Sequence, residues 1–396
     1  MVPPPPPPPP PSSQATAAAP AVASPQPLSV LVIGANGYFG SAICSAFLRA
    51  STPSHFFRVY GLVRREATAR CLALAEVMPI VGSLSERDAL AAKVQSRSKT
   101  WDVIVTCTEP SRADEAQHWD DLVALIQELA KASASLGVKP LVLASSGCKD
   151  YGMTGLDGAK DLAPHTESSP LQTHPLITGR MGAALRALAV AASTGNFDAA
   201  VVRATPVFGY SGSYYGAAFE YAAAFASAPG AEKRTLDFTT DRGTIMHGLH
   251  IDDCGEGYVA LATTYLWGGE EGRRAVAGEV FNLSGRRYET LEEVGAALAR
   301  EYGFGSGARF GVAAAELPPS VSDRNCDLVF GWSQWVSSDK IRRVTGWTDK
   351  RPLFADNIGT YRVAFEAAAQ AGADDVEKAR RRMAGNWGDD YLVAAP

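Results

Sequence analysis

Apolar residues in this chain gather in short continuous runs, and between the runs they are spaced as on one face of a helix. Short apolar runs bounded by turn residues predict buried strands, and the amphipathic stretches predict helices. The two alternate up to about residue 208, which predicts a parallel sheet with helices on both faces, the α/β, doubly wound, Rossmann-type arrangement. Predicted strands are 30–33, 56–63, 77–81, 102–107, 140–145 and 197–203, and predicted helices are 41–50, 66–74, 86–95 and 119–136.

The first predicted strand runs directly into three glycines with the spacing G-x-x-G-x-x-G. A dinucleotide-binding turn needs a strand that ends abruptly, a backbone that comes close to a pyrophosphate, and a helix whose free N–H groups face the phosphates. An ordinary glycine-rich turn has the same composition, but the strand before and the helix after favour the cofactor site. We therefore expect cofactor contacts from Gly34, Asn36, Gly37, Tyr38, Phe39 and Gly40.

Changes in composition divide the chain into four parts. Residues 1–27 are mainly Pro, Ala and Ser without a charged side chain, which predicts a disordered tail, partly in polyproline II conformation. Residues 28–208 are the predicted dinucleotide-binding Rossmann domain. Beyond Gly209 the regular alternation fades, so residues 209–370 are predicted to be mainly a smaller substrate-binding lobe, with parts near 245–285 returning to the Rossmann core. Residues 371–396 are predicted to form a C-terminal helix or tail.

Composition excludes several classes of function. The net charge is -5 and no basic stripe carries interleaved aromatic residues, so a nucleic-acid partner is not expected. The six cysteines include no C-x-x-C pair, which predicts reduced thiols in a cytoplasmic protein without a zinc site. The segment from His247 to Cys254 contains metal-competent side chains, but it reads as a strand entering a helix, so no metal site is predicted. No apolar run is long enough to span a membrane.

The end of the second predicted strand bears on the choice of cofactor. A free ribose 2′-hydroxyl calls for Asp or Glu at this place, whereas a 2′-phosphate calls for arginine. Arg64 and Arg65 stand here, and the first acid is Glu66. This pattern favours NADP(H) over NAD(H), with two arginines on a solvated turn as the alternative.

Six further segments carry recognisable motifs: Ser145–Gly152, Thr166–Pro170, Arg203–Gly209, His250–Asp253, Val280–Leu283 with the helix after it, and Ser338–Trp347. In this order they resemble motifs of the extended short-chain dehydrogenases, the NAD-dependent epimerase/dehydratase family. The resemblance covers about residues 28–370, and it implies a small-molecule substrate and allows a homodimer. Ser83 and Leu84 stand where the family has an Asp-Leu pair near the adenine, and we also expect Cys107, Ser145, Pro206 and Val207 in the cofactor site.

The resemblance fails at the catalytic residues. The family uses a tyrosine as acid/base, a lysine four residues later that lowers its pKa, and a serine or threonine that orients the substrate. Counting from the motifs puts Thr178, Gly182 and Gly147 at these places, and no tyrosine in the chain has a lysine at i+4. The catalytic group is therefore unknown, with Tyr151, His174 and Ser146 as weak candidates.

These features predict an NAD(P)(H)-dependent oxidoreductase or epimerase/dehydratase-like enzyme that acts on a small carbonyl or hydroxyl compound. Its proton would be handled by a non-standard group or by water. The alternative is a non-catalytic NAD(P)-binding sensor or regulatory protein. A retained glycine loop agrees with both, whereas the missing acid/base residues favour the second.

Overall fold

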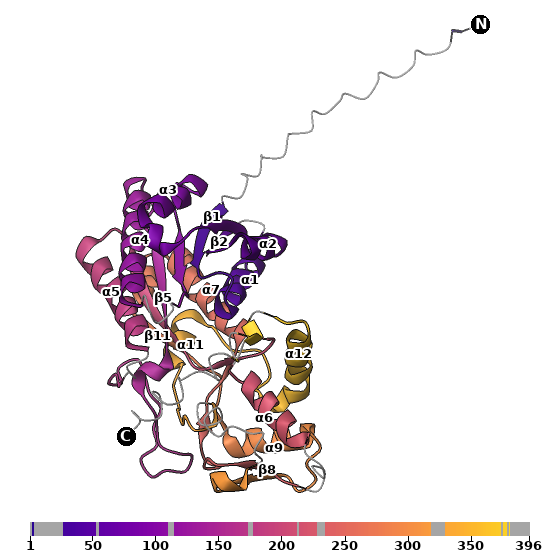
Figure 1. Cartoon of the computed structure of the whole chain (residues 1–396). Coiled ribbons are helices and arrows are strands. Elements are labelled where there is room, and N and C mark those ends of the chain that lie inside the picture. Colours follow the sequence, from indigo (N-terminus) through magenta and orange to yellow (C-terminus); the bar gives the residue numbers. More distant parts are fainter. Residues whose placement is uncertain are drawn as a thin grey trace.

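A computed structural model describes residues 27–377 except 53–54, 110–114, 173–176, 212–213, 228–233, 318–328 and 374, and also residues 2–3 and 380. In these ranges seven parallel strands form one sheet in the order β11-β6-β5-β4-β1-β2-β3 (Figure 1). This order confirms the predicted doubly wound parallel sheet. The strands are β1 (Pro27–Ile33), β2 (Phe56–Val63), β3 (Met78–Val81), β4 (Val103–Thr106), β5 (Leu141–Gly147), β6 (Asp198–Ala204) and β11 (Val280–Leu283).

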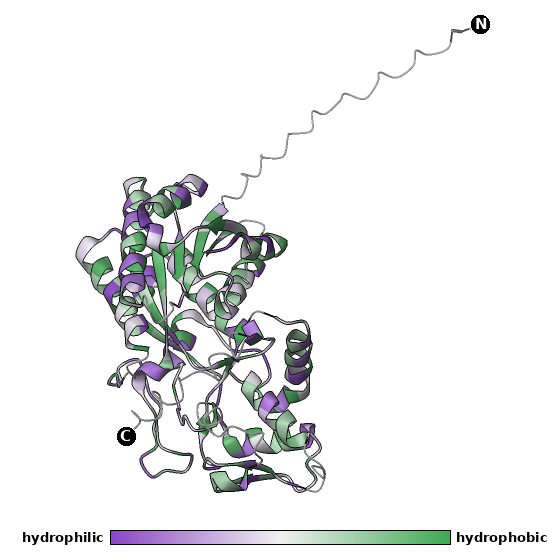
Figure 2. Ribbon diagram, viewed as in Figure 1, coloured by the Kyte–Doolittle hydropathy of each residue, from purple (hydrophilic) through white to green (hydrophobic). Residues whose placement is uncertain are grey.

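Helices cover both faces of the sheet because successive strand residues point to opposite sides. In β1, Val30 and Val32 belong to the core under one set of helices, and Leu31 and Ile33 belong to the core under the other. Apolar strands therefore lie between two layers of amphipathic helices (Figure 2). One layer holds α1 (Tyr38–Arg49), α2 (Glu66–Leu74) and α7 (Ile251–Trp267), and the other holds α3 (Arg87–Arg97), α4 (Glu115–Ser135) and α5 (Thr178–Thr194).

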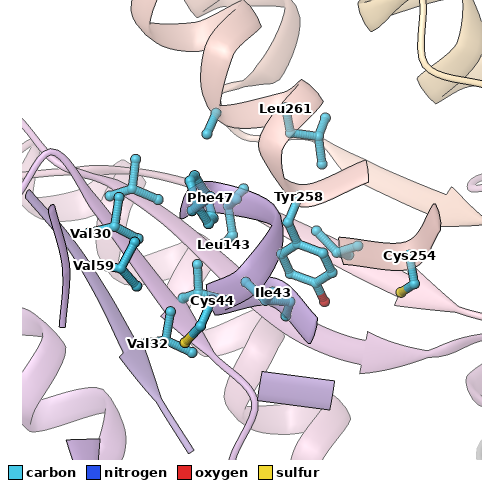
Figure 3. Packing of buried hydrophobic residues seen from close by; sticks show 14 of the residues in the cluster. Val30, Val32, Ile43, Cys44, Phe47, Val59, Leu143, Cys254, Tyr258 and Leu261 are labelled. Atoms are coloured by element: carbon cyan, nitrogen blue, oxygen red, sulfur yellow. The ribbon is translucent and has the colours of Figure 1, made fainter. Parts of the chain in front are cut away.

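Packing between α1, α7 and the sheet fixes the position of α1. Phe47 of α1 and Tyr258 of α7 point into one apolar cluster with the strand residue Val32 (Figure 3). Each of these side chains is almost completely buried, and burial of a large apolar side chain contributes about 1.5–3 kcal/mol. The glycine loop at the start of α1 is therefore attached to a rigid element.

The chain leaves the sheet after β6 and returns to it later. β11 pairs in parallel with β6, Val280 opposite Val201, and α7 packs on α1. The segment between them, together with the residues after β11, builds a second lobe with its own aromatic core around Phe219, Phe238 and Phe354. The boundary between the two predicted domains, after residue 208, stays a prediction.

In the part of the chain that the structure describes, helices and short two-stranded sheets build the second lobe (Figure 1). These pairs join segments that are far apart in the sequence, so the lobe is folded around these connections. No helix in the described ranges has the length and apolar character to cross a bilayer. The elements are α6 (Gly216–Ala226), α9 (Leu291–Glu301), α12 (Ile358–Gln370), β7 (Val207–Phe208), β8 (Leu236–Phe238), β9 (Ile245–Met246), β10 (Leu249–His250), β12 (Glu289–Thr290) and β13 (Ala308–Phe310), with α8 (Gly269–Val276) and α11 (Asp339–Thr345) beside the sheet.

Candidate functional site

A cavity of about 570 Å³ opens at the carboxyl ends of the parallel strands. It spans the ends of β1 to β6, and it includes the point between β1 and β4 from which the strand order runs in both directions. Ligands of open α/β sheets bind in the crevice at such a switch point. The volume lies in the range of cofactor and ligand sites.

Twelve of the thirteen residues predicted to contact a cofactor line this one cavity. The exception is Gly40, which lies in the first turn of α1, where a Cβ would collide with the carbonyl oxygen of Gly34. Close packing of helix on strand is the part that a third glycine plays in such loops. The twelve are Gly34, Asn36, Gly37, Tyr38, Phe39, Arg64, Ser83, Leu84, Cys107, Ser145, Pro206 and Val207.

The glycine loop leaves an open space at the N-terminus of α1. Gly34 has φ +94°, and a Cβ there would lie 2.8 Å from the Cys107 carbonyl oxygen. Gly37 is the N-cap of α1, and a Cβ on it would meet only the Gly34 carbonyl oxygen, at 3.4 Å, so the space beside it belongs to the cavity. The first N–H groups of any α-helix have no partner within the helix, and the first turn of α1 contains no acidic residue. Such a helix end attracts a phosphate.

Other lining residues are held by contacts behind the cavity wall. The Oγ of Ser145 and the hydroxyl of Tyr258 share a hydrogen bond of 2.7 Å. The Tyr38 hydroxyl donates to the Gly209 carbonyl oxygen at 2.5 Å, which ties the glycine loop to the segment after β7. Arg64 is exposed at the rim, whereas Arg65 is the N-cap of α2 and does not line the cavity.

The positions expected for the family's catalytic residues are occupied differently. Thr178 is exposed at the start of α5, and neither Thr178 nor Gly182 lines the cavity. A Cβ on Gly147 would lie 2.8 Å from Nη2 of Arg180. The guanidinium of this α5 residue therefore fills the space next to Gly147, and Arg180 lines the cavity.

The three weak catalytic candidates have different surroundings. Tyr151 is fully buried outside the cavity lining, and burial raises its pKa to about 12. Its hydroxyl accepts a hydrogen bond from Nη1 of Arg203 at 2.9 Å and donates one to Oδ1 of Asn282 at 2.8 Å. Ser146 lines the cavity and its Oγ donates to Oδ2 of Asp150 at 2.5 Å. His174 lies outside the described residues.

We expect Tyr151→Phe to lower stability without lowering turnover per folded molecule. The substitution removes the acceptor for Arg203 and the donor for Asn282, both in the protein interior, and an unsatisfied buried polar group costs about 1–3 kcal/mol. Urea denaturation measures the first effect and turnover corrected for folded fraction measures the second. A loss of turnover with unchanged stability would make Tyr151 a catalytic candidate again.

Sequence reasoning did not propose Lys149 or Arg180, although both line the cavity. Lys149 belongs to a short 3-10 helix, η3 (Cys148–Tyr151), which follows β5 directly. Its Nζ lies 4.2 Å from the centroid of the Trp332 ring, at cation–π distance. Burial disfavours the ammonium and the Arg180 guanidinium repels it, which lowers the pKa of Lys149 to about 7. The signal for Lys149 in the sequence was its place shortly after the predicted strand 140–145, close to Tyr151.

The histidines of the segment from His247 to Cys254 form hydrogen bonds with backbone groups. His247 donates from Nε2 to the Gly285 carbonyl oxygen at 3.0 Å and accepts the Val336 N–H on Nδ1 at 3.2 Å. His250 accepts the Asp252 N–H on Nδ1 at 3.1 Å. Within the described ranges, no three His, Cys, Asp or Glu side chains are grouped as metal ligands would be.

Comparisons with known proteins agree with this geometry. Residues 30–292 match the model of the NAD dependent epimerase/dehydratase family. The fold is similar to that of UDP-glucuronic acid 4-epimerase from Bacillus cereus, solved in complex with NAD, with TM-score 0.59, 16% identity, and coverage of 86% of this chain and 99% of that one.

Two further structures show the same likeness. dTDP-glucose 4,6-dehydratase from Bacillus anthracis, in complex with NAD, has TM-score 0.60 and 16% identity and covers 87% of this chain and 98% of its own. The UDP-Glc/GlcNAc 4-epimerase from Campylobacter jejuni has a TM-score of 0.59 and 20% identity, and the match covers 87% of this chain and 99% of that one. At these identities the likeness establishes the fold. The comparison with curated proteins gave no match.

Proposed function

This chain belongs to the NAD dependent epimerase/dehydratase family, and we propose that it is an NAD(P)(H)-dependent oxidoreductase or epimerase/dehydratase acting on a small carbonyl or hydroxyl compound. Family membership supports an enzyme of the extended short-chain dehydrogenase type. The proposal depends above all on one observation: the glycine loop and the carboxyl ends of β1 to β6 line the same cavity. Such a crevice is where this fold class binds nucleotides.

The residues present fit a dinucleotide. The backbone N–H groups of Tyr38 and Phe39 would hold the pyrophosphate, because no side chain fills the space beside Gly37, whose own N–H donates to the Gly34 carbonyl oxygen at 3.1 Å. Ser83 and Leu84 would face the adenine, and Ser145, Pro206 and Val207 would line the nicotinamide end. When bound, the dinucleotide supplies or accepts a hydride, and the protein must then exchange a proton with the substrate oxygen.

NADP(H) is the preferred cofactor in this proposal, because Arg64 stands at the rim of the cavity after β2. A guanidinium can form charge-assisted hydrogen bonds to a 2′-phosphate. We expect Arg64→Ala to weaken NADPH binding by about 10-fold, equal to about 1.4 kcal/mol, and to leave NADH binding unchanged. Arg65→Ala is the matched control, since Arg65 lies outside the cavity lining. Calorimetric titration with NADPH and NADH measures both effects. A wild-type protein that binds NADH more tightly than NADPH would contradict the proposed preference for NADP(H).

Sugar nucleotides are the first substrates to test. The similar structures include a UDP-glucuronic acid 4-epimerase with UDP-glucuronic acid and NAD bound, and a UDP-glucose 4-epimerase with NAD+ and UDP bound. The function is tested by incubating the full chain with NADPH or NADP+ and a panel of UDP-sugars, aldehydes and ketones. Turnover of a panel member supports the enzyme. The homodimer and the cytoplasmic location stay predictions.

A non-catalytic sensor is the second candidate function. It is favoured by the exposed position of Thr178 and by Gly182, since neither residue lines the cavity. A sensor would bind the dinucleotide and show neither turnover nor hydride exchange over the whole panel. The same incubation therefore separates the two functions.

A further inference from the structure

We propose that Lys149 exchanges the proton with the substrate oxygen in this cavity, where the family would use a tyrosine, and that Arg180 is its positioning residue. This inference rests on the proposed function. It names a catalytic group for a site whose expected acid/base position, Thr178, lies outside the cavity lining.

Lys149 lies where a proton-transfer group is needed. It follows the end of β5 within two residues of Gly147, and both residues line the cavity that also contains the glycine loop. Its Nζ is held 4.2 Å from the Trp332 ring centroid. A contact of this kind fixes the amine in place, and an acid/base group must be positioned before it can act.

Arg180 is a second cation in the same wall. Its Nη2 lies 2.8 Å from the place that a Cβ on Gly147 would take, so a side chain at Gly147 would displace the guanidinium. Nη1 of Arg180 donates a hydrogen bond to Oε1 of Glu109 at 3.4 Å, and Nη2 lies 4.0 Å from Oδ1 of Asp150. These two ion pairs hold the guanidinium in the cavity wall.

The two cations together suit Lys149 to proton exchange at neutral pH. Burial first, and repulsion by Arg180 second, lower the pKa of Lys149 to about 7. A group with a pKa near the working pH can both donate and accept a proton. Asp150 beside it is engaged by Ser146 and Arg203. The other titratable groups that line the cavity are Glu109, His118, Asp121, Cys107, Cys148, Arg64, Tyr38, Tyr214 and Asp375.

The proton step balances in both directions. In reduction, a bound dinucleotide would supply the hydride to the carbonyl carbon. As the carbon–oxygen π bond breaks, an N–H bond of the Lys149 ammonium breaks and an O–H bond forms on the substrate. The neutral amine that remains takes its next proton from water. In oxidation the neutral amine removes the hydroxyl proton, so reduction should slow and oxidation should quicken as the pH rises through about 7.

Lys149→Met and Lys149→Arg test the proposal in the full chain. We expect Lys149→Met to lower kcat on any turned-over UDP-sugar, aldehyde or ketone by about 100- to 10,000-fold, with the Kd for NADPH changed little. Lys149→Arg should lose as much, because a guanidinium does not release its proton near neutral pH. A merely structural role would be rescued by arginine, which keeps the charge over Trp332. Lys139→Met is the control, since Lys139 pairs with Asp198 at the surface.

A second readout does not depend on turnover. Acetic anhydride labelling of the protein without nucleotide, followed by peptide mass spectrometry over a range of pH, should show a Lys149 amine that titrates near 7. Arg180→Gln should move this titration to higher pH. A Lys149 titration above about 9 overturns the proposal, since an ordinary lysine titrates near 10.4. Turnover of the Lys149→Met variant at the wild-type rate would also overturn the role of Lys149, and the proposed function would stand. Absence of wild-type turnover over the whole panel overturns the proposed function, and this inference falls with it.

Discussion

Gly37→Val should weaken dinucleotide binding by about 100-fold or more, equal to about 2.7 kcal/mol, while the protein stays folded. A valine side chain would occupy the open space at the N-cap of α1, where the pyrophosphate would meet the backbone. Each hydrogen bond to a charged group contributes about 1.5–3 kcal/mol, so loss of one or two accounts for the effect. Titration of the full chain with NADPH measures it.

The fold tolerates this change because Gly37 has φ -76° and its added Cβ meets only one protein atom. A β-branched N-cap costs about 1 kcal/mol relative to a good cap, which is small for a protein of this size. Gly182→Val is the matched control, since a Cβ at Gly182 meets nothing within 4 Å and Gly182 does not line the cavity. Equal affinity for NADPH in the wild type and in Gly37→Val would show that the glycine loop is not part of the binding site.

Arg203→Leu should lower the free energy of unfolding by about 3–5 kcal/mol, because it leaves the buried carboxylate of Asp150 without its closest cation. Nε of Arg203 donates to Oδ2 of Asp150 at 3.2 Å, and the side chains are 3% and 0% exposed. The same guanidinium also donates to Tyr151. Burial already raises the pKa of Asp150, so loss of the arginine would favour the protonated acid. Urea denaturation near neutral pH measures the loss.

Arg186→Leu is the control for this variant. Arg186 of α5 pairs with Asp120 of α4, but both side chains are about half exposed, and surface ion pairs contribute about 0–1 kcal/mol. The double variant Arg203→Leu with Asp150→Leu should recover part of the stability, because no isolated charge then remains buried. A loss below about 1 kcal/mol for Arg203→Leu alone would show that the ion pair between η3 and β6 does not stabilise the fold as its burial indicates.

Much of the fold could be predicted because its signals are local. The predicted strand 56–63 and helix 66–74 coincide with β2 and α2, where an apolar run and an amphipathic stretch are separated by the arginines. The alternation of such units requires a parallel sheet. Sequence reasoning was less informative for the second lobe, where pairs such as β8 with β13 join distant segments of three residues each.

The cofactor side of the site followed from the same local logic, because glycines after the first strand and residues at strand ends must meet at one edge of the sheet. The reaction side did not. Sequence reasoning noted a serine or threonine missing at Gly147, but the space is filled by Arg180 from a helix later in the chain. The environment of Lys149 depends on Trp332 from the far end of the sequence. Such contacts arise only from tertiary packing.

A crystal structure of the full chain grown with NADPH tests the central claim most directly. It should show the pyrophosphate at the N-terminus of α1 beside Gly37, the 2′-phosphate within hydrogen-bond distance of Arg64, and the nicotinamide in the part of the cavity lined by Ser145 and Lys149. NADPH bound elsewhere, or its absence from this cavity at saturating concentration, would contradict the assignment.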